Sequence, residues 1–253
     1  MFKTFYTTFN LGPIPIQFWG FFVALGMVLS FLIVWHRSKK LGLNGEKNID
    51  IGVWVIVAGI IWARLFHVFF YEPIFFLNNL GDIIKIWQGG MSSFGGLFGA
   101  VFAIFILLKR KKIRKKDLVE LADLFSFSTL YGWILGRVGC VMIHDHLGKI
   151  TESIFSVQTI DGLRYEMAFL EIIWLIPLAV IFYISRNRKM FRGYYLISLF
   201  IYYGILRFIL DFYRATDIVH ADARYFGLTP GQYFGMVLVI VGVYLSRKVR
   251  IVA

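Results

Sequence analysis

The sequence predicts an all-α polytopic membrane protein: a single domain, residues 1–253, of seven transmembrane helices. Of its 253 residues, 58% are hydrophobic and 17% are charged, and the mean hydropathy is +0.71. Soluble domains carry about 25% charged residues. A transmembrane helix needs about 20 apolar residues to cross about 30 Å of hydrocarbon. Runs of that kind recur along the chain, and most basic residues lie in the short loops between them.

Seven apolar runs define the predicted helices. The first opens with Pro13 and Pro15, which suit the first turn of a helix because no N–H is needed there. The runs are Ile14–Trp35, Ile51–Tyr71, Met91–Leu108, Leu118–Ile143, Glu166–Ile184, Gly193–Leu210 and Pro230–Leu245.

The lysines and arginines predict the orientation. Alternate loops hold 18 of the 27 basic residues, and cytoplasmic loops are the ones enriched in such residues. We therefore expect the N-terminus outside and the C-terminus in the cytoplasm. The basic loops are Arg37–Lys47, Lys109–Lys116, Arg186–Arg192 and Arg247–Arg250.

Two outer loops carry structure of their own. Phe75–Trp87 mixes aromatic, aliphatic and polar residues, which predicts a helix lying in the membrane interface. Thr151–Glu166 alternates around Asp161-Gly162, which favours a hairpin with a tight turn. An irregular loop is the alternative for that segment.

Two arginines near the outer ends of apolar runs are the first candidate site residues. Arg137 and Arg207 are costly in hydrocarbon, and ionisable residues kept there usually face the bundle interior. Guanidinium groups match phosphate with paired donors, so a phospholipid head group is the expected partner. Tyr203 and Asp211 share a helix face with Arg207. The structural alternative is an Arg207–Asp211 ion pair, with Arg137 capped by backbone carbonyls.

The triplet His144-Asp145-His146 follows Arg137 by about two helical turns. Histidine titrates near neutrality, and a neighbouring carboxylate orients it, so the triplet is a candidate for acid–base chemistry. If the predicted helix Leu118–Ile143 continued beyond its last residue, Gly148 would lie on the same helix face as Arg137 and His144. The alternatives are solvated histidines in a loop, or a metal site completed by His220 and Asp222. We expect no metal and no organic cofactor.

A glycine-rich segment, Gly89–Gly99, opens the third run. Its glycines allow close approach of a neighbouring helix, which is the commoner cause, or of a ligand. Ser92 and Ser93 are candidate helix caps that would leave N–H donors facing an anion. Gly95 and Gly96 belong to the same candidate site.

Several function classes are disfavoured. The net charge of +12 lies mostly in loops between apolar runs, which is a topology signal rather than a nucleic-acid surface. A retinal protein would need a lysine inside the last run, and Pro230–Leu245 has none. An ion transporter would need carboxylates through the midplane, whereas we place the acidic residues at the ends of the runs.

A set of motifs, in order, resembles the prolipoprotein diacylglyceryl transferase family over nearly the whole chain. They are Gly-Gly-Met-Ser-Ser-x-Gly-Gly at 89–96, Gly-Arg-Val-Gly at 136–139 extended to Gly148, Tyr165-Glu166, Tyr203-Gly-x-x-Arg207-Phe, and Gly-Leu-Thr-Pro-Gly-Gln at 227–232.

The resemblance implies transfer of the diacylglyceryl group of phosphatidylglycerol to the lipobox cysteine thiol of a prolipoprotein, with release of glycerol phosphate. It implies that Arg137 and Arg207 hold the phosphate, and that Tyr203, Asp211 and Gly148 line the same site. Asp145 and Asp211 stand where the family commonly has glutamate.

Three other positions depart from the family pattern. Phe94 replaces a histidine that is a candidate base, Cys140 replaces an asparagine, and Trp19 replaces a tyrosine. We hypothesise that His144 or His146, paired with Asp145, removes the thiol proton, because the thiolate is the nucleophile.

The expected location is the bacterial cytoplasmic (inner) membrane. The expected partners are phosphatidylglycerol, a prolipoprotein signal peptide and the lipid bilayer. The alternative function, motivated by Phe94, is a catalytically altered or inactive paralogue that binds phospholipid head groups.

Overall fold

The computed structural model describes residues 7–11, 14–86, 90–110, 112–114, 117–159, 161–218 and 221–252. The chain divides into two compact units. One comprises Met1–Ile33 with Val119–Ala253, and the other comprises Val34–Leu118. We describe each unit by itself.

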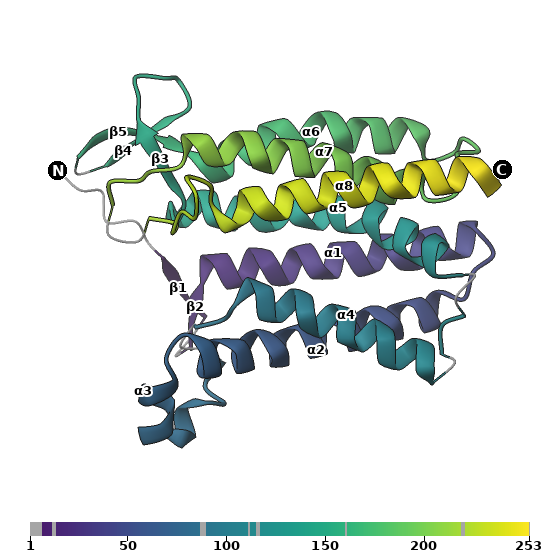
Figure 1. Cartoon of the computed structure of the whole chain (residues 1–253), viewed down its shortest axis with the longest axis horizontal. Helices are drawn as coiled ribbons and strands as arrows, with labels where there is room; N and C mark the ends of the chain where they lie inside the picture. Colours follow the sequence, from purple (N-terminus) through teal and green to yellow (C-terminus); the bar gives the residue numbers. More distant parts are fainter. Residues whose placement is uncertain are drawn as a thin grey trace. The chain divides into compact units, whose positions relative to one another are not determined.

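In the described residues, seven long helices coincide with the seven predicted runs, apart from their ends (Figure 1). Five segments are long and apolar enough to cross a membrane: α1, α2, α5, α6 and Tyr194–Tyr213, which contains α7. Helix α4, with 17 residues, is shorter. The chain is therefore a mostly helical, multi-pass membrane protein. The helices are α1 (Phe18–Lys40), α2 (Gly45–Phe70), α4 (Ser93–Lys109), α5 (Leu118–Ile143), α6 (Met167–Ser185), α7 (Tyr194–Leu210) and α8 (Pro230–Val252).

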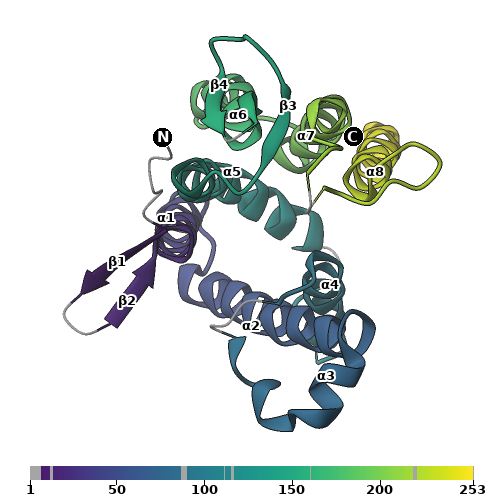
Figure 2. The same ribbon diagram turned by 90° about the vertical axis from the view of Figure 1, so that its left-hand side faces the viewer.

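Glycines bring helices of the larger unit close together. A Cβ on Gly204 of α7 would lie 2.6 Å from the carbonyl oxygen of Gly235 on α8, and the two helices run side by side in both views (Figures 1 and 2). A Cβ on Gly132 of α5 would lie 2.2 Å from the carbonyl oxygen of Gly26 on α1. Small residues at such crossings let helix backbones pack closely within a membrane. The core between α5, α6 and α7 is built from Phe127, Leu130, Leu170, Leu175, Leu178, Phe182, Tyr195 and Leu206.

The start of the first helix was wrongly predicted. Residues 14–17 form strand β2 (Ile14–Gln17), which pairs antiparallel with β1 (Thr8–Leu11), and α1 begins only at Phe18. Pro15 lies opposite Asn10 in this two-stranded sheet, a position that a proline tolerates at a sheet edge. Residues 14–17, which the apolar pattern assigned to the helix, therefore form a strand because they pair with β1. Pro13 lies outside the described residues.

The predicted hairpin before α6 is confirmed. Strands β4 (Ser156–Thr159) and β5 (Gly162–Glu166) pair antiparallel, and β3 (Leu147–Ile150) pairs with the other edge of β5. Gly162 has a φ of +118°, which favours glycine at the tight turn. Arg164 of β5 is buried and contacts both carboxylate oxygens of Asp217, at 2.9 and 2.7 Å. This ion pair attaches the sheet to the segment that follows α7.

In the smaller unit, α2 packs against α4, and a buried arginine organises the connection between them. Arg64 of α2 donates to the carbonyl oxygens of Ile83 at 2.9 Å, Asp82 at 2.6 Å and Gly90 at 2.9 Å. The predicted interfacial helix is instead two short pieces, α3 (Pro73–Asn78) and η1 (Leu80–Asp82). The two pieces are separated at Asn79, and the Arg64 contacts fix the end of the second piece. Trp87 lies outside the described residues.

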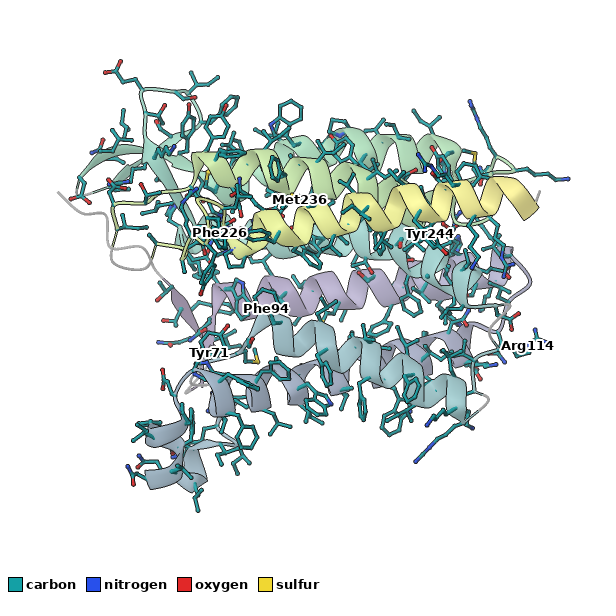
Figure 3. All side chains as sticks on the ribbon, in the orientation of Figure 1. Tyr71, Phe94, Arg114, Phe226, Met236 and Tyr244 are labelled. Atoms are coloured by element: carbon teal, nitrogen blue, oxygen red, sulfur yellow. The ribbon has the colours of Figure 1, made fainter. Side chains whose placement is uncertain are left out.

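Large apolar side chains project from the outer faces of both units (Figure 3). Tyr244 of α8 is 61% exposed and Trp54 of α2 is 63% exposed. Water-soluble proteins rarely expose contiguous apolar surface of this kind, because it is costly in water. These faces are suited to lipid.

Candidate active site

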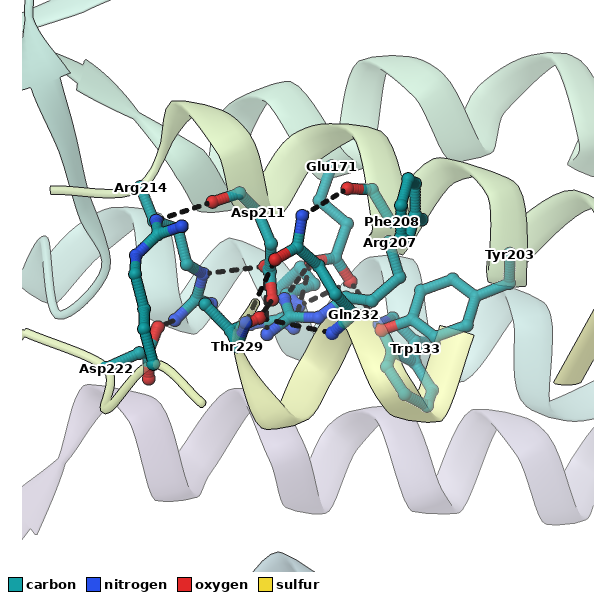
Figure 4. Close-up of polar contacts among 12 residues, drawn as sticks. Trp133, Glu171, Tyr203, Arg207, Phe208, Asp211, Arg214, Asp222, Thr229 and Gln232 are labelled. Carbon is teal, nitrogen blue, oxygen red and sulfur yellow. Dashed lines mark hydrogen bonds and ion pairs between the residues drawn. The ribbon is translucent and has the colours of Figure 1, made fainter. Parts of the chain in front are cut away.

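Two arginines from different helices converge on one carboxylate of a third. Arg137 of α5 donates from Nε to Oε1 of Glu171 at 2.9 Å, and its Nη2 lies 2.9 Å from Oε2. Nη1 of Arg207, on α7, lies 3.8 Å from the same Oε2 (Figure 4). Glu171 lies on α6 and is 3% exposed. The alternative in which backbone carbonyls cap Arg137 is wrong, because Glu171 satisfies its charge.

Each arginine has an aromatic residue one helical turn before it. Trp133 precedes Arg137 on α5, and Tyr203 precedes Arg207 on α7, both with a spacing of four residues. Their rings pack edge to face with centroids 5.0 Å apart. The indole Nε1 of Trp133 donates to Oε1 of Glu171 at 2.9 Å, and the hydroxyl of Tyr203 donates to the same atom at 3.5 Å. The carboxylate is therefore held by donors from both sides.

Asp211 is fully buried just beyond Arg207. Its Oδ1 lies 3.2 Å from Nη2 of Arg207 and 3.0 Å from Nε of Arg214. Its Oδ2 accepts a hydrogen bond from Thr229 Oγ1, and Arg214 pairs in turn with Asp222. The Arg207–Asp211 ion pair of the structural alternative is thus present, within a series of alternating charges that continues through the Glu171 carboxylate to Arg137 (Figure 4).

The Gly-Leu-Thr-Pro-Gly-Gln segment, 227–232, closes this cluster from α8. Gln232 accepts from the backbone N–H of Thr229 at 2.9 Å and donates to the carbonyl oxygen of Phe208 at 3.2 Å. A Cβ on Gly231 would lie 2.4 Å from Oδ2 of Asp211 and 2.8 Å from Nε of Arg207. Only a residue without a side chain leaves room for both charged groups at that position.

The helix that carries Arg137 ends at Ile143, and the chain then reverses. His144 has a φ of +50°, and its Nδ1 contacts Oε2 of Glu166, the N-cap residue of α6. The antiparallel pairing of Leu147 with Glu166 brings these residues together. The structure thus gives His144 a partner, Glu166, that the sequence did not indicate, and the hypothesis that His144 or His146, paired with Asp145, removes the thiol proton stays a prediction. Because α5 ends at Ile143, the condition for Gly148 to share a helix face with Arg137 is not met, and Gly148 lies in a strand instead.

The second histidine of the triplet, His146, also lies near Asp145. Its Nε2 lies 3.6 Å from Oδ2 of that carboxylate. Burial, followed by the positive charges of Arg214, Arg137 and Arg207, lowers the pKa of His146 to about 3. Burial also raises the pKa of the Asp145 carboxyl and of the Glu166 carboxyl, the latter against an opposing contribution from His144. His146 is consequently neutral at neutral pH and a weak base.

Cys140 lies beside this pair. Its Sγ, the Asp145 carboxylate and the His146 ring have ligand atoms within 4.8 Å of one another. Nη1 of Arg137 also lies 3.7 Å from Sγ. These three residue types can bind a metal, but the arginines that depress the pKa of His146 make the surroundings unfavourable for a cation. His220, the suggested further ligand, lies outside the described residues.

Comparison with known proteins identifies the family. A family model described as Prolipoprotein diacylglyceryl transferase matches residues 6–247. The chain belongs to this family. Proteins named phosphatidylglycerol–prolipoprotein diacylglyceryl transferase are 30% identical over 255 residues in Listeria monocytogenes, covering 95% of this chain and 89% of the relative, and 30% identical over 245 residues in Finegoldia magna, covering 96% and 94%. A relative of that name from Staphylococcus xylosus is 30% identical over 257 residues, covering 96% and 89%.

Gly148, which the family resemblance assigns to the substrate site, has a packing role in this transferase family member. It lies in β3 and forms an antiparallel bridge with Arg214. A Cβ there would lie 2.6 Å from Cβ of Tyr165 and 2.7 Å from the carbonyl oxygen of Tyr213. The glycine therefore lets the strand lie directly against the segment that carries Arg214.

The glycine-rich family motif at the start of α4 serves helix packing in the smaller unit. A Cβ on Gly95 would lie 2.4 Å from the carbonyl oxygen of Trp62 on α2, whereas Gly96 has only ordinary contacts. Ser92 is the N-cap, and its Oγ accepts from the N–H of Gly95 at 3.3 Å. Phe94, where the family has a histidine, is about half exposed (Figure 3). Gly89 and the side chain of Ser93 lie outside the described residues.

Sequence reasoning missed Glu171 and the partnership of His144 with Glu166. A signal for Glu171 existed, since a carboxylate in the second turn of an apolar helix needs a buried partner as much as an arginine does. We instead placed the acidic residues at the ends of the runs. No linear spacing connects His144 with Glu166, because strand pairing alone brings them together.

Proposed function

We propose that this chain transfers the sn-1,2-diacylglyceryl group of phosphatidylglycerol to the lipobox cysteine thiol of prolipoproteins and releases glycerol phosphate, the first step of lipoprotein maturation. One observation carries the proposal within this family: the guanidinium groups of Arg137 and Arg207 both contact the Glu171 carboxylate. A place where two arginines from separate helices stabilise one anion is suited to a phosphate group.

The chemistry requires one bond to form and one to break. The thiolate sulfur attacks the glyceryl carbon that carries the phosphate oxygen, so a C–S bond forms and the C–O bond breaks. The electron pair of that C–O bond goes to the phosphate oxygen. Arg137 and Arg207 stabilise the charge that develops there, and two positioned donors at a developing charge are among the strongest catalytic contributions.

The thiol proton needs an acceptor, and we assign that role to His144. Its Nδ1 contact with Glu166 favours the tautomer in which Nε2 is the acceptor nitrogen, and the carboxylate stabilises the imidazolium formed on proton uptake. His146, with a pKa of about 3, is too weak a base for this step. Asp145 and His146 would instead shape the electrostatics beside Arg137.

The remaining substrate contacts are proposals of the same kind. Tyr203 donates to Glu171, the shared partner of the two arginines, and Asp211 pairs with Arg207. Gly148 lets β3 approach the segment that carries Arg214. We assign the start of α4, with Ser93, Gly95 and Gly96, to the binding of the lipid substrate.

The proposed setting is the cytoplasmic (inner) membrane of a bacterium. We propose a single domain of seven spans with the N-terminus outside and the C-terminus in the cytoplasm. Length and composition of five segments support the spans. In this orientation the Arg137–Arg207 site faces the outer leaflet, where the lipoprotein precursor arrives.

The test uses the purified protein, a lipobox peptide and vesicles containing phosphatidylglycerol. We expect a peptide heavier by one diacylglyceryl group and an equal amount of glycerol phosphate. Arg137→Ala should abolish both products, whereas Arg188→Ala, which removes an exposed arginine, should not. Phosphatidylglycerol binding without transfer would contradict the proposal and favour the alternative of a lipid-binding paralogue, which Phe94 in place of the family histidine supports.

A further inference from the structure

The Arg137–Arg207 site already contains an anion of its own. Glu171 is buried, accepts from Trp133 and Arg137, and lies against Arg207. A phosphate bound by both guanidinium groups would therefore lie beside this carboxylate. Like charges at short range repel, and the repulsion grows in proportion to the charge of the ligand.

The proposed reaction changes that ligand charge. The phosphodiester of phosphatidylglycerol carries one negative charge. The phosphomonoester that leaves carries about −1.5 to −2 at pH 7, because its second pKa is about 6. Two arginines alone would hold the product more tightly than the substrate, and product release would then limit turnover.

We propose that Glu171 sets the charge selectivity of this site: its carboxylate disfavours the phosphomonoester dianion relative to the phosphodiester monoanion and so promotes product release. The inference rests on the proposed function. It makes Glu171 a specificity-determining residue rather than only a counter-ion for buried arginines. A purely structural counter-ion would stabilise the fold without changing the relative affinity for the two phosphate classes.

The variant that separates these roles is Glu171→Gln. The amide keeps a carbonyl oxygen to accept from Trp133 and Arg137 but removes the negative charge. We expect the dissociation constant for sn-glycerol phosphate, measured by calorimetry on the purified protein at pH 7.5, to fall about tenfold, and the KM for phosphatidylglycerol to fall less. Tenfold corresponds to about 1.4 kcal/mol, a modest share of a charge–charge interaction at this range. The first turnover should remain fast and later turnovers should slow.

Two matched variants complete the design. Glu152→Gln removes the same charge from an exposed residue outside the cluster and should leave both constants unchanged. Glu171→Asp keeps the charge and should retain the low affinity for glycerol phosphate. If Glu171→Gln binds glycerol phosphate no more tightly than the unaltered protein, or gains equally for both phosphate classes, the proposal is wrong.

The unaltered protein offers a second measurement if Glu171→Gln does not fold. Glycerol phosphate gains its second charge between pH 5 and pH 7.5. Because Glu171 opposes the dianion, the dissociation constant for glycerol phosphate should change less than threefold between pH 5 and pH 7.5. A dissociation constant that falls tenfold over this range would overturn the inference. These binding measurements need no turnover, so absence of transfer would count against the proposed function and not against the role of Glu171.

Discussion

Arginines inside apolar helices find two different kinds of partner in this protein. In the smaller unit, Arg64 of α2 donates to the backbone carbonyls of Asp82, Ile83 and Gly90. In the larger unit, Arg137 and Arg207 both contact the carboxylate of Glu171 on α6, and Arg207 also pairs with Asp211 at the end of its own helix. Carbonyls belong to the fold and cannot leave, so Arg64 holds a loop in place. The Glu171 carboxylate is shared between two arginines, so its contact with one of them can give way to a phosphate oxygen while the carboxylate stays beside the phosphate.

The comparison shows that a charge in a spanning helix does not by itself mark a functional site. The nature of the partner distinguishes the two cases. Capping by carbonyls was our structural alternative for Arg137, and it is found instead at Arg64. We therefore expect the two regions to respond differently to substitution: in activity for Arg137 and Arg207, and in stability for Arg64.

The largest expected effect is on transfer activity. Arg137→Ala and Arg207→Ala should each lower kcat/KM at least about a thousandfold, because each removes a donor aimed at the charge that develops on phosphate. Peptide modification in phosphatidylglycerol vesicles, normalised to folded protein, measures this loss. If either variant keeps more than a tenth of the transfer activity, the substituted arginine does not contribute to phosphate stabilisation as proposed.

Arg64→Ala should act on stability. It leaves several partly buried carbonyl oxygens without their donor, and an unsatisfied group costs about 1–3 kcal/mol when fully buried, so we expect about 3 kcal/mol in total. Thermal unfolding of the detergent-solubilised protein measures the effect, with Arg64→Lys expected to be intermediate. Activity per folded molecule should stay close to that of the unaltered protein. A thousandfold loss of activity per folded molecule in Arg64→Ala would contradict the claim that Arg64 acts on stability alone.

His144→Gln should lower kcat about a hundredfold, since a positioned general base contributes about 10²- to 10⁴-fold. Glu166→Gln should cause a smaller loss, because the imidazole loses the carboxylate that contacts Nδ1 and fixes its orientation. His146→Gln serves as the matched control on the same loop and should change kcat little. Equal losses in the two histidine variants would contradict the assignment of the base.

The smallest expected effect concerns pH and stability. The pKa of His146 is lowered from 6.5 to about 3, so in the folded protein this imidazole stays neutral where an unfolded chain would bind a proton. Protonation then favours the unfolded state, and stability falls as the pH drops from about 6.5 towards 3. His146→Gln should make the melting temperature less sensitive to acid over this range. An unchanged slope would show that burial and the three arginines do not act on His146 as described.

Sequence reasoning predicted the helices well and the small sheets only in part. Helix ranges follow from long apolar runs, which the bilayer requires whatever the tertiary contacts. Residues 14–17 include two isoleucines and join the first apolar run, but pairing with Thr8–Leu11 makes them a strand. The hairpin at Asp161-Gly162 was predictable because the turn needs a residue like Gly162.

The site residues that stand out by their own charge in an apolar helix were predictable from the sequence. The partners that reach them from other helices or through strand pairing were not. Arg137, Arg207, Tyr203 and Asp211 do lie in one cluster, as their positions on the helices indicated. Their common partner Glu171 lies on another helix. His144 contacts Glu166 because β3 pairs with β5, which no local pattern reveals.

The central claim is that Arg137 and Arg207 grip the same phosphate. A structure of the protein with phosphatidylglycerol in a lipid nanodisc tests it most directly. The account predicts phosphate oxygens within hydrogen-bond distance of both guanidinium groups, with the Arg207–Glu171 contact lengthened. A head group bound elsewhere, with Arg137 still paired to Glu171 and Arg207 to Asp211 as now, would contradict it.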